Sequence, residues 1–266
     1  MSKMLFKSTL RDIKSTKARF FSILLIILIG VGFFTGIKSS KPSMMAVVDK
    51  YYEDTKLMDF RLLSTVGFDD ADIDAIKDMD GVTDVQAGFF SDVFLGGDAG
   101  GSVVRLHAFK SSEDALNQPV VVSGRLPENK NEALAGVSSF GAVDVGSEIY
   151  FTLNDSDIGG ILTETEFTVV GQVESPLYIS FDRGTTNIGN GSISLYMLLP
   201  EESFVSDRYT EVYVKTELSE EFDPYTEEYD NAIEKMSAEF EALGAERVET
   251  FNDDTLKEAQ SSLDEA

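Results

Sequence analysis

The longest apolar segment of the chain lies close to its N-terminus. Eighteen consecutive uncharged residues run from Phe20 to Ile37, with the sequence FFSILLIILIGVGFFTGI. At 1.5 Å per residue a helix of this length rises about 27 Å, close to the roughly 30 Å hydrocarbon core of a bilayer. The pattern predicts a transmembrane helix.

A cleaved signal peptide is the alternative interpretation of this segment. The apolar region of a signal peptide is usually about 7–15 residues long and ends at a small-x-small cleavage site. Here the apolar run is longer, and Lys38-Ser39-Ser40-Lys41-Pro42 follows without such a site. The preceding segment also alternates basic and apolar residues, which is typical of a helix in the cytoplasmic headgroup layer. We therefore expect residues 1–40 to be a cytoplasmic amphipathic lead-in and a retained transmembrane helix.

Within the apolar run, Gly32 and Gly36 form a GxxxG pair. Two glycines four residues apart share one face of a helix and allow a second membrane helix to approach closely. Glycine is also generally frequent in membrane helices, so the simpler interpretation stays open. The sequence predicts Gly32 and Gly36 as membrane-helix packing residues.

The residues after the membrane helix show the pattern of a folded α+β domain. Alternation over Leu57–Ser64 predicts a strand, and residues 69–79 predict a short helix with an aspartate N-cap and an apolar inner face. A long strand is expected over Val82–Leu95. A glycine-rich hairpin loop at residues 96–101 is expected to return as a strand over Ser102–Phe109.

A β-rich subdomain is expected over residues 119–205, inserted into a core domain of residues 41–250. Short β-rich pieces are separated there by Gly, Asn, Asp and Ser, which favour turns. A strand over Glu211–Thr216 then returns to the α+β unit. The strands expected inside the inserted subdomain are Val120–Val122, Glu148–Leu153, Glu166–Val173 and Ser192–Leu199.

The C-terminal region shows helical periodicity. A helix is expected over Pro224–Leu243, and Gly244 is expected to end it. After Arg247–Phe251, Asp253 is expected to begin a further helix, so that residues 251–266 form the start of a helical or coiled-coil stalk. The apolar positions of the first of these helices are Tyr225, Tyr229, Ile233, Met236, Phe240 and Leu243.

Charge is distributed unevenly along the chain. The whole chain has 22 basic and 47 acidic residues and a net charge of −25, but residues 1–41 contain eight of the bases and one acid. Six of those bases precede the apolar run, so the positive-inside rule places the N-terminus in the cytoplasm and the acidic bulk outside. The acidity excludes nucleic acid as a partner.

Candidate catalytic and metal-binding residues are few. The chain has no cysteine and one histidine, His107, which alternates along an expected strand with Arg105 and Phe109. One histidine cannot form a multi-histidine metal site, and no nucleophile motif or P-loop accompanies it. We expect His107 to be structural, and we expect neither a cofactor nor a metal. A surface hydrolase acting through paired carboxylates stays a remote alternative.

Two acidic segments resemble cation-binding loops. Asp70-Ala71-Asp72-Ile73-Asp74 begins like a calcium loop, but Ala75 and Gly81 stand where that loop needs Gly and Glu. These acids also suit the first turn of a helix, where the dipole favours negative charge. The segment Asn154–Gly159 allows weak cation binding, and turn chemistry explains it equally well.

Several motifs, taken in order, resemble FtsX/MacB-type ABC transporter permeases. The N-terminal Leu10-Arg11-Asp12-Ile13-Lys14 and Lys17-Ala18-Arg19-Phe20 run directly into the membrane helix, as in that family. Four later motifs are similar to the pattern of the MacB-like periplasmic core domain. They are Gly124-Arg125-Leu126-Pro127, Asn131-Glu132-Ala133-Leu134, Val145-Gly146-Ser147-Glu148-Ile149 and Phe167-Thr168-Val169-Val170-Gly171-Gln172-Val173.

The resemblance implies a permease subunit of the cell membrane rather than an enzyme. It implies a separate cytoplasmic ATP-binding-cassette ATPase as partner, and other permease helices or a second permease copy as neighbours in the lipid bilayer. The outer domain would transmit ATPase-driven motion for export or envelope-related work. Such permeases have several membrane helices, whereas this sequence has one apolar run of that length. We therefore expect the front portion of a longer permease; a single-pass membrane-anchored extracellular binding module is the alternative.

Overall fold

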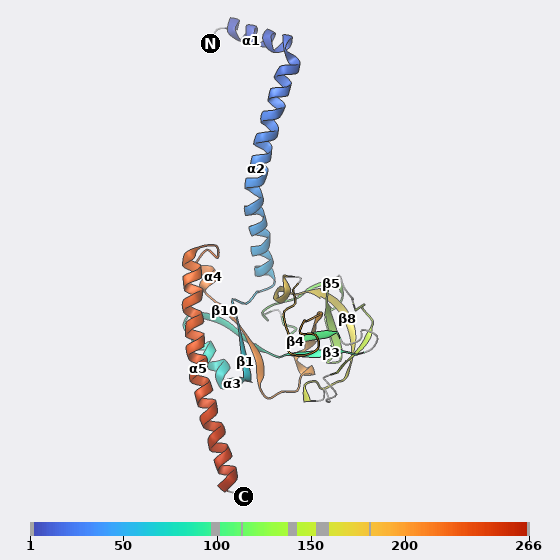
Figure 1. Cartoon of the computed structure of the whole chain (residues 1–266), viewed down its shortest axis with the longest axis vertical. Helices are drawn as coiled ribbons and strands as arrows, with labels where there is room; N and C mark the ends of the chain where they lie inside the picture. Colours follow the sequence, from blue (N-terminus) through green and yellow to red (C-terminus); the bar gives the residue numbers. More distant parts are fainter. Residues whose placement is uncertain are drawn as a thin grey trace. The chain divides into compact units, whose positions relative to one another are not determined.

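The computed structural model describes residues 3–96, 102–112, 114–137, 143–152, 160–180 and 182–264. It separates into two compact units, Met1–Asp54 and Thr55–Ala266. The helices (Figure 1) are α1 (Lys3–Ser15), α2 (Lys17–Asp54), α3 (Asp70–Lys77), α4 (Leu218–Glu221) and α5 (Glu227–Asp264), with 3-10 turns η2 (Pro176–Tyr178) and η3 (Glu201–Ser203). The strands are β1 (Phe60–Phe68), β2 (Val82–Gly88), β3 (Phe90–Leu95), β4 (Val103–Phe109), β5 (Val120–Gly124), β6 (Glu132–Gly136), β7 (Glu148–Thr152), β8 (Glu166–Glu174), β9 (Leu195–Pro200) and β10 (Tyr209–Thr216).

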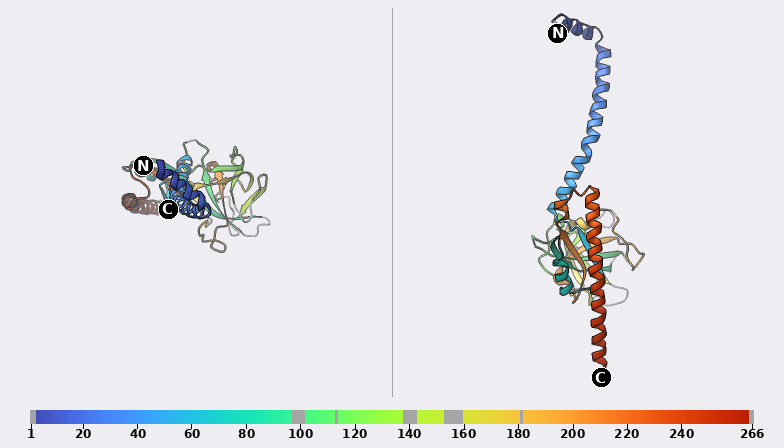
Figure 2. Two further views of the ribbon diagram at one scale, coloured as in Figure 1. Left: turned by 90° about the horizontal axis from the view of Figure 1, so that it is seen from above. Right: turned by 90° about the vertical axis from the view of Figure 1, so that its left-hand side faces the viewer.

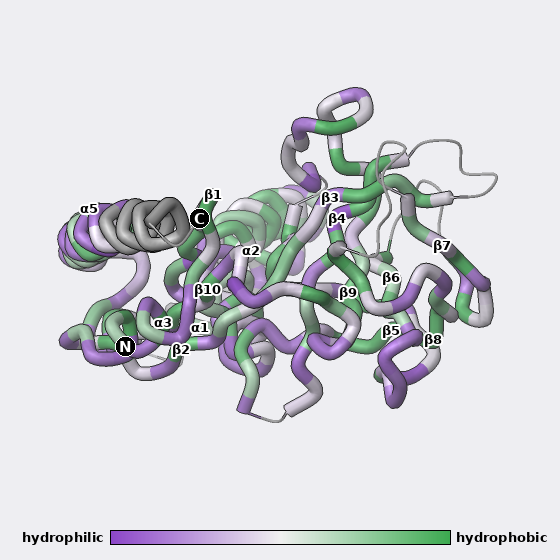
Figure 3. Tube along the Cα trace, turned by 90° about the horizontal axis from the view of Figure 1, so that it is seen from below, coloured by the Kyte–Doolittle hydropathy of each residue, from purple (hydrophilic) through white to green (hydrophobic). Residues whose placement is uncertain are grey.

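The first unit consists of α1 and α2. Helix α2 has 38 residues and a window of mean hydropathy 2.6, and it is the one helix among the described residues that is long and apolar enough to cross a membrane. None of its side chains is buried within the chain. Its apolar residues are visible as a green stretch in Figure 3. A helix that is apolar on all sides needs an apolar environment, which a bilayer provides.

The smaller of two sheets lies in the second unit and has the strand order β1-β10-β2, with both pairs antiparallel. Helices α3 and α5 pack against one face of it (Figure 1). The alternation of β10 explains this, because Val212 and Val214 point toward the helices while Glu211 and Tyr213 point to the other face. The buried residues of this cluster are Ile73, Ile76, Val212, Val214, Met236 and Phe240.

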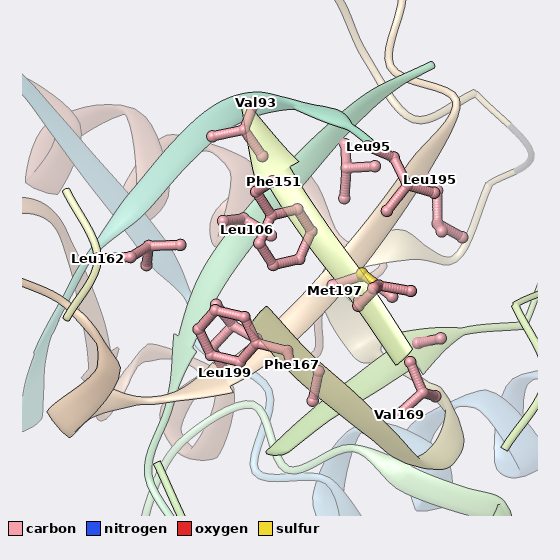
Figure 4. Packing of buried hydrophobic residues seen from close by; sticks show 14 residues of the cluster. Val93, Leu95, Leu106, Phe151, Leu162, Phe167, Val169, Leu195, Met197 and Leu199 are labelled. Atoms are coloured by element: carbon pink, nitrogen blue, oxygen red, sulfur yellow. The ribbon is translucent and has the colours of Figure 1, made fainter. Parts of the chain in front are cut away.

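The larger sheet has seven strands in the order β5-β8-β6-β9-β4-β3-β7. An additional β7–β8 pairing closes six of these strands into a barrel, to which β5 is attached through β8. The apolar core fills the barrel (Figure 4). It comprises Val93, Leu95, Val104, Leu106, Ala133, Ala135, Ile149, Phe151, Leu162, Phe167, Val169, Leu195, Met197 and Leu199. The expected α+β fold with an N-terminal apolar helix is confirmed.

The single long strand expected over Val82–Leu95 is wrong, because the chain changes sheets in its middle. Strand β2 belongs to the small sheet and β3 to the large one, and Phe89 lies between them. Its buried ring is close to the rings of Phe204 and Tyr209, at 5.6 and 5.1 Å between centroids. Periodicity does not reveal such a crossing, since both halves alternate as strands do. The large sheet thus includes β3 and β4, which precede the β-rich subdomain expected over residues 119–205. It also includes β6, which was not among the expected strands.

The expected end of a helix at Gly244 is also wrong. Helix α5 runs without interruption from Glu227 to Asp264, as the right-hand view of Figure 2 shows. Contacts beyond the glycine explain its continuity: Arg247 pairs with Asp72 of α3, and the guanidinium of Arg208 lies 4.9 Å from the ring centre of Phe251. These contacts offset the roughly 1 kcal/mol that glycine costs inside a helix. Tyr225, expected on the inner face, precedes α5 and is exposed.

Candidate functional site

The segment that follows α2, Thr55–Asp59, is anchored to the connection between β4 and β5. The backbone N–H groups of Asn117 and Gln118 donate to the carbonyl oxygens of Lys56 and Thr55, at 3.0 and 2.8 Å. The side-chain oxygen of Asn117 accepts the N–H of Met58 at 3.0 Å. Thr55 and Asn117 are both buried, so the first residue after α2 already belongs to the folded domain.

The same segment is anchored to the end of β10. The carboxylate of Asp59 accepts hydrogen bonds from the Nζ of Lys215 at 2.8 Å and from the N–H and hydroxyl of Thr216 at 2.8 and 2.9 Å. The Asp59 N–H donates to the carbonyl oxygen of Val214 at 2.9 Å, and Lys215 also donates to the Leu57 carbonyl at 3.1 Å. We call residues Thr55–Asp59 the junction segment. It is hydrogen-bonded to the β4–β5 connection of the large sheet and to strand β10 of the small sheet.

A buried charge cluster joins the two sheets. Glu211 of β10 lies at its centre: its Oε1 is 2.9 Å from the His107 Nδ1 of β4, and Arg61 of β1 donates to its Oε2 at 2.8 Å. The hydroxyl of Tyr213 donates to Glu211 Oε1 at 2.6 Å, and the hydroxyl of Tyr178 lies 2.7 Å from the His107 Nε2. Three of these residues come from the small sheet, His107 comes from the large one, and Tyr178 comes from η2.

The electrostatics of the cluster favour an ionised Glu211. Burial by itself raises the pKa of the Glu211 carboxyl, but His107, Arg61 and the Tyr213 hydroxyl stabilise the charged form more strongly and lower the pKa to about 2. Burial raises the pKa of Tyr178 and of Tyr213 above the ordinary range, so both phenols stay protonated and are able to donate. The cluster therefore holds an ionised Glu211 whose two carboxylate oxygens both accept hydrogen bonds.

Solvent does not reach the centre of this cluster. The exposed fractions of His107 and Glu211 are 1% and 0%. A closed arrangement of this kind gives no access to a substrate, but it fixes the two sheets to each other. His107 thus has the burial and partners typical of a structural histidine.

The four core-domain motifs meet around β8. Arg125 of the first motif forms a bidentate pair with Glu132 of the second, with both N–O distances at 2.7 Å. Glu132 also accepts the Glu128 N–H at 2.8 Å and the Asn129 side-chain amide at 3.1 Å. The hydrogen bond from Arg125, followed by those from Glu128 and Asn129, lowers the pKa of Glu132 to about 2 against the effect of burial.

Two glycines of these motifs allow a close backbone approach. Gly124 has a φ of +79°, and a Cβ there would lie 2.2 Å from the carbonyl oxygen of Val170. A Cβ on Gly171 would lie 2.5 Å from the carbonyl oxygen of Arg125. The Arg125 N–H donates to the Val170 carbonyl at 3.0 Å, and the Gly146 N–H donates to the Val169 carbonyl at 2.7 Å. The motif residues therefore position the backbone of the barrel.

The aspartates of the calcium-like motif cap a helix. The Asp72 N–H donates to the Asp69 carboxylate, and the Asp69 N–H donates to the Asp72 carboxylate, both at 2.9 Å, which forms a capping box at the start of α3. Asp72 is also paired with Arg247. In the part of the chain that the structure describes, no group of three or more His, Cys, Asp or Glu side chains could hold a metal ion. The candidate segment Asn154–Gly159 lies outside the described residues.

Gly32 and Gly36 lie one turn apart in α2 and therefore on the same face of the helix. A Cβ built on either would meet no atom within 4 Å. The packing of a second membrane helix on this face stays a prediction.

Sequence reasoning missed the residues that pair with His107 and those that hold the junction segment. Glu211, Tyr213 and Lys215 alternate with Val212 and Val214, and such a pattern normally indicates one solvated and one buried face. The Glu-x-Tyr pair was the available signal that this face is also buried, since a tyrosine side chain is rarely fully exposed to solvent. His107 and Glu211 are 104 residues apart, and no local sequence pattern reveals that they pair.

Comparisons with known proteins found similarity to solved structures alone. No family model matches the sequence, and no curated protein matches it. Among solved structures, the extracellular domain of the noncanonic ABC-type transporter YknZ from Gram-positive bacteria has a TM-score of 0.38 and 17% identity, covering 66% of this chain and 87% of that one. The periplasmic region of MacB from Actinobacillus actinomycetemcomitans has a TM-score of 0.32 and 11% identity, covering 67% and 75%.

A third similar structure is a domain of a protein from Porphyromonas gingivalis described as a permease. Its TM-score is 0.32 and its identity 15%, covering 61% of this chain and 63% of that one. The first of the three is described as an extracellular domain and the second as a periplasmic region.

Proposed function

We propose that this chain is the N-terminal portion of an ABC transporter permease subunit of the FtsX/MacB type. Residues 1–40 comprise the cytoplasmic lead-in and the membrane helix, residues 41–250 form the extracytoplasmic core domain, and residues 251–266 begin a helical stalk. A separate cytoplasmic ATPase moves the membrane helices, and the core domain transmits that motion outside the cell membrane. The motifs around β8 and the 18-residue apolar run within α2 support this assignment.

The junction segment is the observation that carries the proposal. Helix α2 ends at Asp54, and the very next residue, Thr55, accepts a backbone hydrogen bond from Gln118 at 2.8 Å. Asp59, four residues later, is bound to the end of β10. A segment that is hydrogen-bonded to the β4–β5 connection and to β10 passes a displacement of its N-terminal end on to both of them. The cluster around Glu211 keeps the sheets together during that displacement.

The test is a flexible insertion at this point. Six Gly/Ser residues placed between Asp54 and Thr55 should leave the ATPase bound to the permease but remove the ATP-dependent fluorescence change of a dye attached to Ala238→Cys. The dye labels a single site because the chain has no cysteine. The matched control is the same insertion between Pro224 and Tyr225, in an exposed segment ahead of α5. An unchanged ATP response with the Asp54–Thr55 insertion would contradict transmission through the junction.

Orientation is tested by labelling with a membrane-impermeant maleimide. Ala238→Cys should react in intact cells, and Ser8→Cys in α1 should react after permeabilisation alone. The basic N-terminal segment supports this orientation. The reverse pattern of labelling would place the domain in the cytoplasm and end the proposal.

Helix packing is tested at the GxxxG pair. Replacing Gly32 and Gly36 with Leu should reduce co-purification with other permease helices, because the larger side chains prevent close approach. Gly30→Leu, in the same helix but on another face, is the matched control. Equal co-purification of both variants would remove the packing role.

A membrane-anchored binding module is the second candidate function. The observation that favours it is a cleft of about 690 Å³ between β1 and α5. Under this alternative, no ATPase subunit co-purifies and the domain acts through its ligand alone.

A further inference from the structure

The cleft between β1 and α5 runs along an open strand edge. Strand β1 is an edge strand, paired with β10 on one side. Residues of both alternating sets in β1 line the cleft, for example Leu62 from the face that packs toward α5 and Leu63 from the opposite face. Both faces of a strand line one cleft when the cleft reaches the strand's edge. Alternate backbone N–H and C=O groups of β1 therefore face the cleft.

The opposite wall of the cleft is one face of α5. Its lining residues Ser237, Glu241, Gly244, Val248 and Phe251 are spaced by four and three residues, which places them on one side of the helix. Phe240 and Leu243 extend the apolar lining toward the small sheet's core. Leu63 and Val248 are 57% and 47% exposed, so apolar surface is open to solvent on both walls.

The charges around the cleft indicate the charge of the ligand that it binds. Three arginines line it, Arg61, Arg208 and Arg247, and each is paired with a carboxylate, so they do not attract an anion. Glu241 has an exposed position on the α5 wall. Residues 42–266 contain 46 acidic and 14 basic residues, and this field repels anionic lipids and a second copy of the chain alike. A cationic partner is drawn toward the same surface.

We propose that this cleft binds an extended peptide in which basic and apolar residues alternate. The peptide backbone adds to β1 as a further strand along Phe60–Leu63. It stops short of Val66 and Gly67, whose carbonyl oxygens already accept hydrogen bonds from Arg208. Its apolar side chains contact Leu62, Phe240 and Leu243, and its basic side chains lie toward Glu241 and solvent. The ligand is a free peptide from the surrounding medium. This activity does not depend on the proposed coupling to an ATPase.

The test uses the full chain in nanodiscs of zwitterionic phosphatidylcholine, to which a basic peptide has little affinity. A fluorescent (Val-Lys)4 peptide is titrated and its anisotropy measured against empty nanodiscs. We expect saturable binding that weakens with salt, because the steering charges are exposed. A (Val-Glu)4 peptide should not bind. The same (Val-Lys)4 peptide with N-methyl groups on alternate amides should bind at least about tenfold more weakly, since N-methylation removes strand pairing.

Two tryptophan variants locate the site. Val248→Trp fills the cleft from an exposed position and should weaken peptide binding by at least about tenfold. Ala242→Trp, an exposed α5 residue that does not line the cleft, is the matched control and should bind as the unmodified chain does. Equal binding of the N-methylated peptide, or equal binding by Val248→Trp, would overturn the proposal in favour of general attraction to an acidic surface. Concentration-dependent dimerisation that Val248→Trp abolishes would overturn it in favour of a second copy.

Discussion

The two sheets of the outer unit are stabilised in different ways. The barrel encloses fourteen buried residues that are all apolar, and its strands close on themselves through β7 and β8. The small sheet has an apolar face under α3 and α5, whereas its other face presents Glu211 and Tyr213 to the barrel. The barrel therefore contains its own core. The small sheet depends on two neighbours, a helical layer and a charged contact.

Removing the central carboxylate should have the largest effect on this arrangement. Glu211→Ala leaves the buried His107 and the partly exposed Arg61 without their partner, and breaking a buried ion pair costs about 3–5 kcal/mol. Hydrogen exchange should show β10 losing protection while β9 in the barrel keeps it. The double variant Arg61→Met with Glu211→Met removes both charges and should lose less. Equal loss of protection in β9 and β10 would show that the two sheets unfold as one unit.

A pair of matched methionine substitutions compares the two cores directly. Met197 is fully buried in the barrel, and Met236 is 7% exposed in the smaller core. Met197→Ala should lower the free energy of unfolding by about 4 kcal/mol, and Met236→Ala by about 2 kcal/mol, because a site near an opening collapses more easily. Urea denaturation followed by circular dichroism measures both. A larger loss at Met236 would reverse the comparison.

Acid should lower the free energy of unfolding through Glu211 in the small sheet and through Glu132 in the barrel. A variant of Glu132 separates the two effects. Glu211 and Glu132 have folded pKa values of about 2 against the ordinary value of 4.5. A lowered pKa stabilises the folded chain above pH 4.5, and this stabilisation is lost as the pH falls from 4.5 toward 2. Because Arg125 is half exposed, solvent screening limits the part due to Glu132 to about 1 kcal/mol. Glu132→Gln should flatten that part of the pH dependence of the urea midpoint; an unchanged slope would exclude it.

A glycine substitution should have the smallest effect, in the stabilising direction. A Cβ on Gly244 would meet no atom within 4 Å, so Gly244→Ala should raise the free energy of unfolding by about 0.5–1 kcal/mol through its better helix propensity. Gly124→Ala, where a Cβ would lie 2.2 Å from Val170 O, should be strongly destabilising. Thermal unfolding distinguishes the two. A neutral or negative result at Gly244 would mean that this part of α5 is not helical in solution.

Local patterns predicted most of the fold's elements but not their assignment to sheets. The α3 cap and its inward Ile73 and Ile76 follow from nearby residues, as does the apolar run within α2. The change of sheet at Phe89 depends on distant rings. Strand β6 is buried along its whole length, so it lacks the alternation that would reveal it. Helix α5 passes Gly244 because Arg247 meets Asp72, a contact between residues far apart in the sequence.

The candidate site was less predictable than the fold. The motifs located Arg125 and Glu132, but their bidentate pairing depends on the path of the chain between them. His107 was expected to be structural from the lack of companions, while its actual partners come from β10 and η2. The junction segment had no motif at all. Its bonds to Asn117 and Thr216 join residues that are 59 and 157 positions apart in the sequence.

The path of the chain between the two sheets also allows the barrel to be replaced by another inserted domain. Everything from β3 to β9 leaves the small sheet after Gly88 and returns to it at β10, where Gly88 and Glu211 are register partners on adjacent strands. The two ends of this long excursion are thus about 5 Å apart. An insert of another size or fold, with its ends at the same spacing, would leave the host sheet's hydrogen bonding intact. In evolution, and equally in protein engineering, this position is an insertion point: the barrel is replaceable by another domain while the three-stranded sheet stays the same.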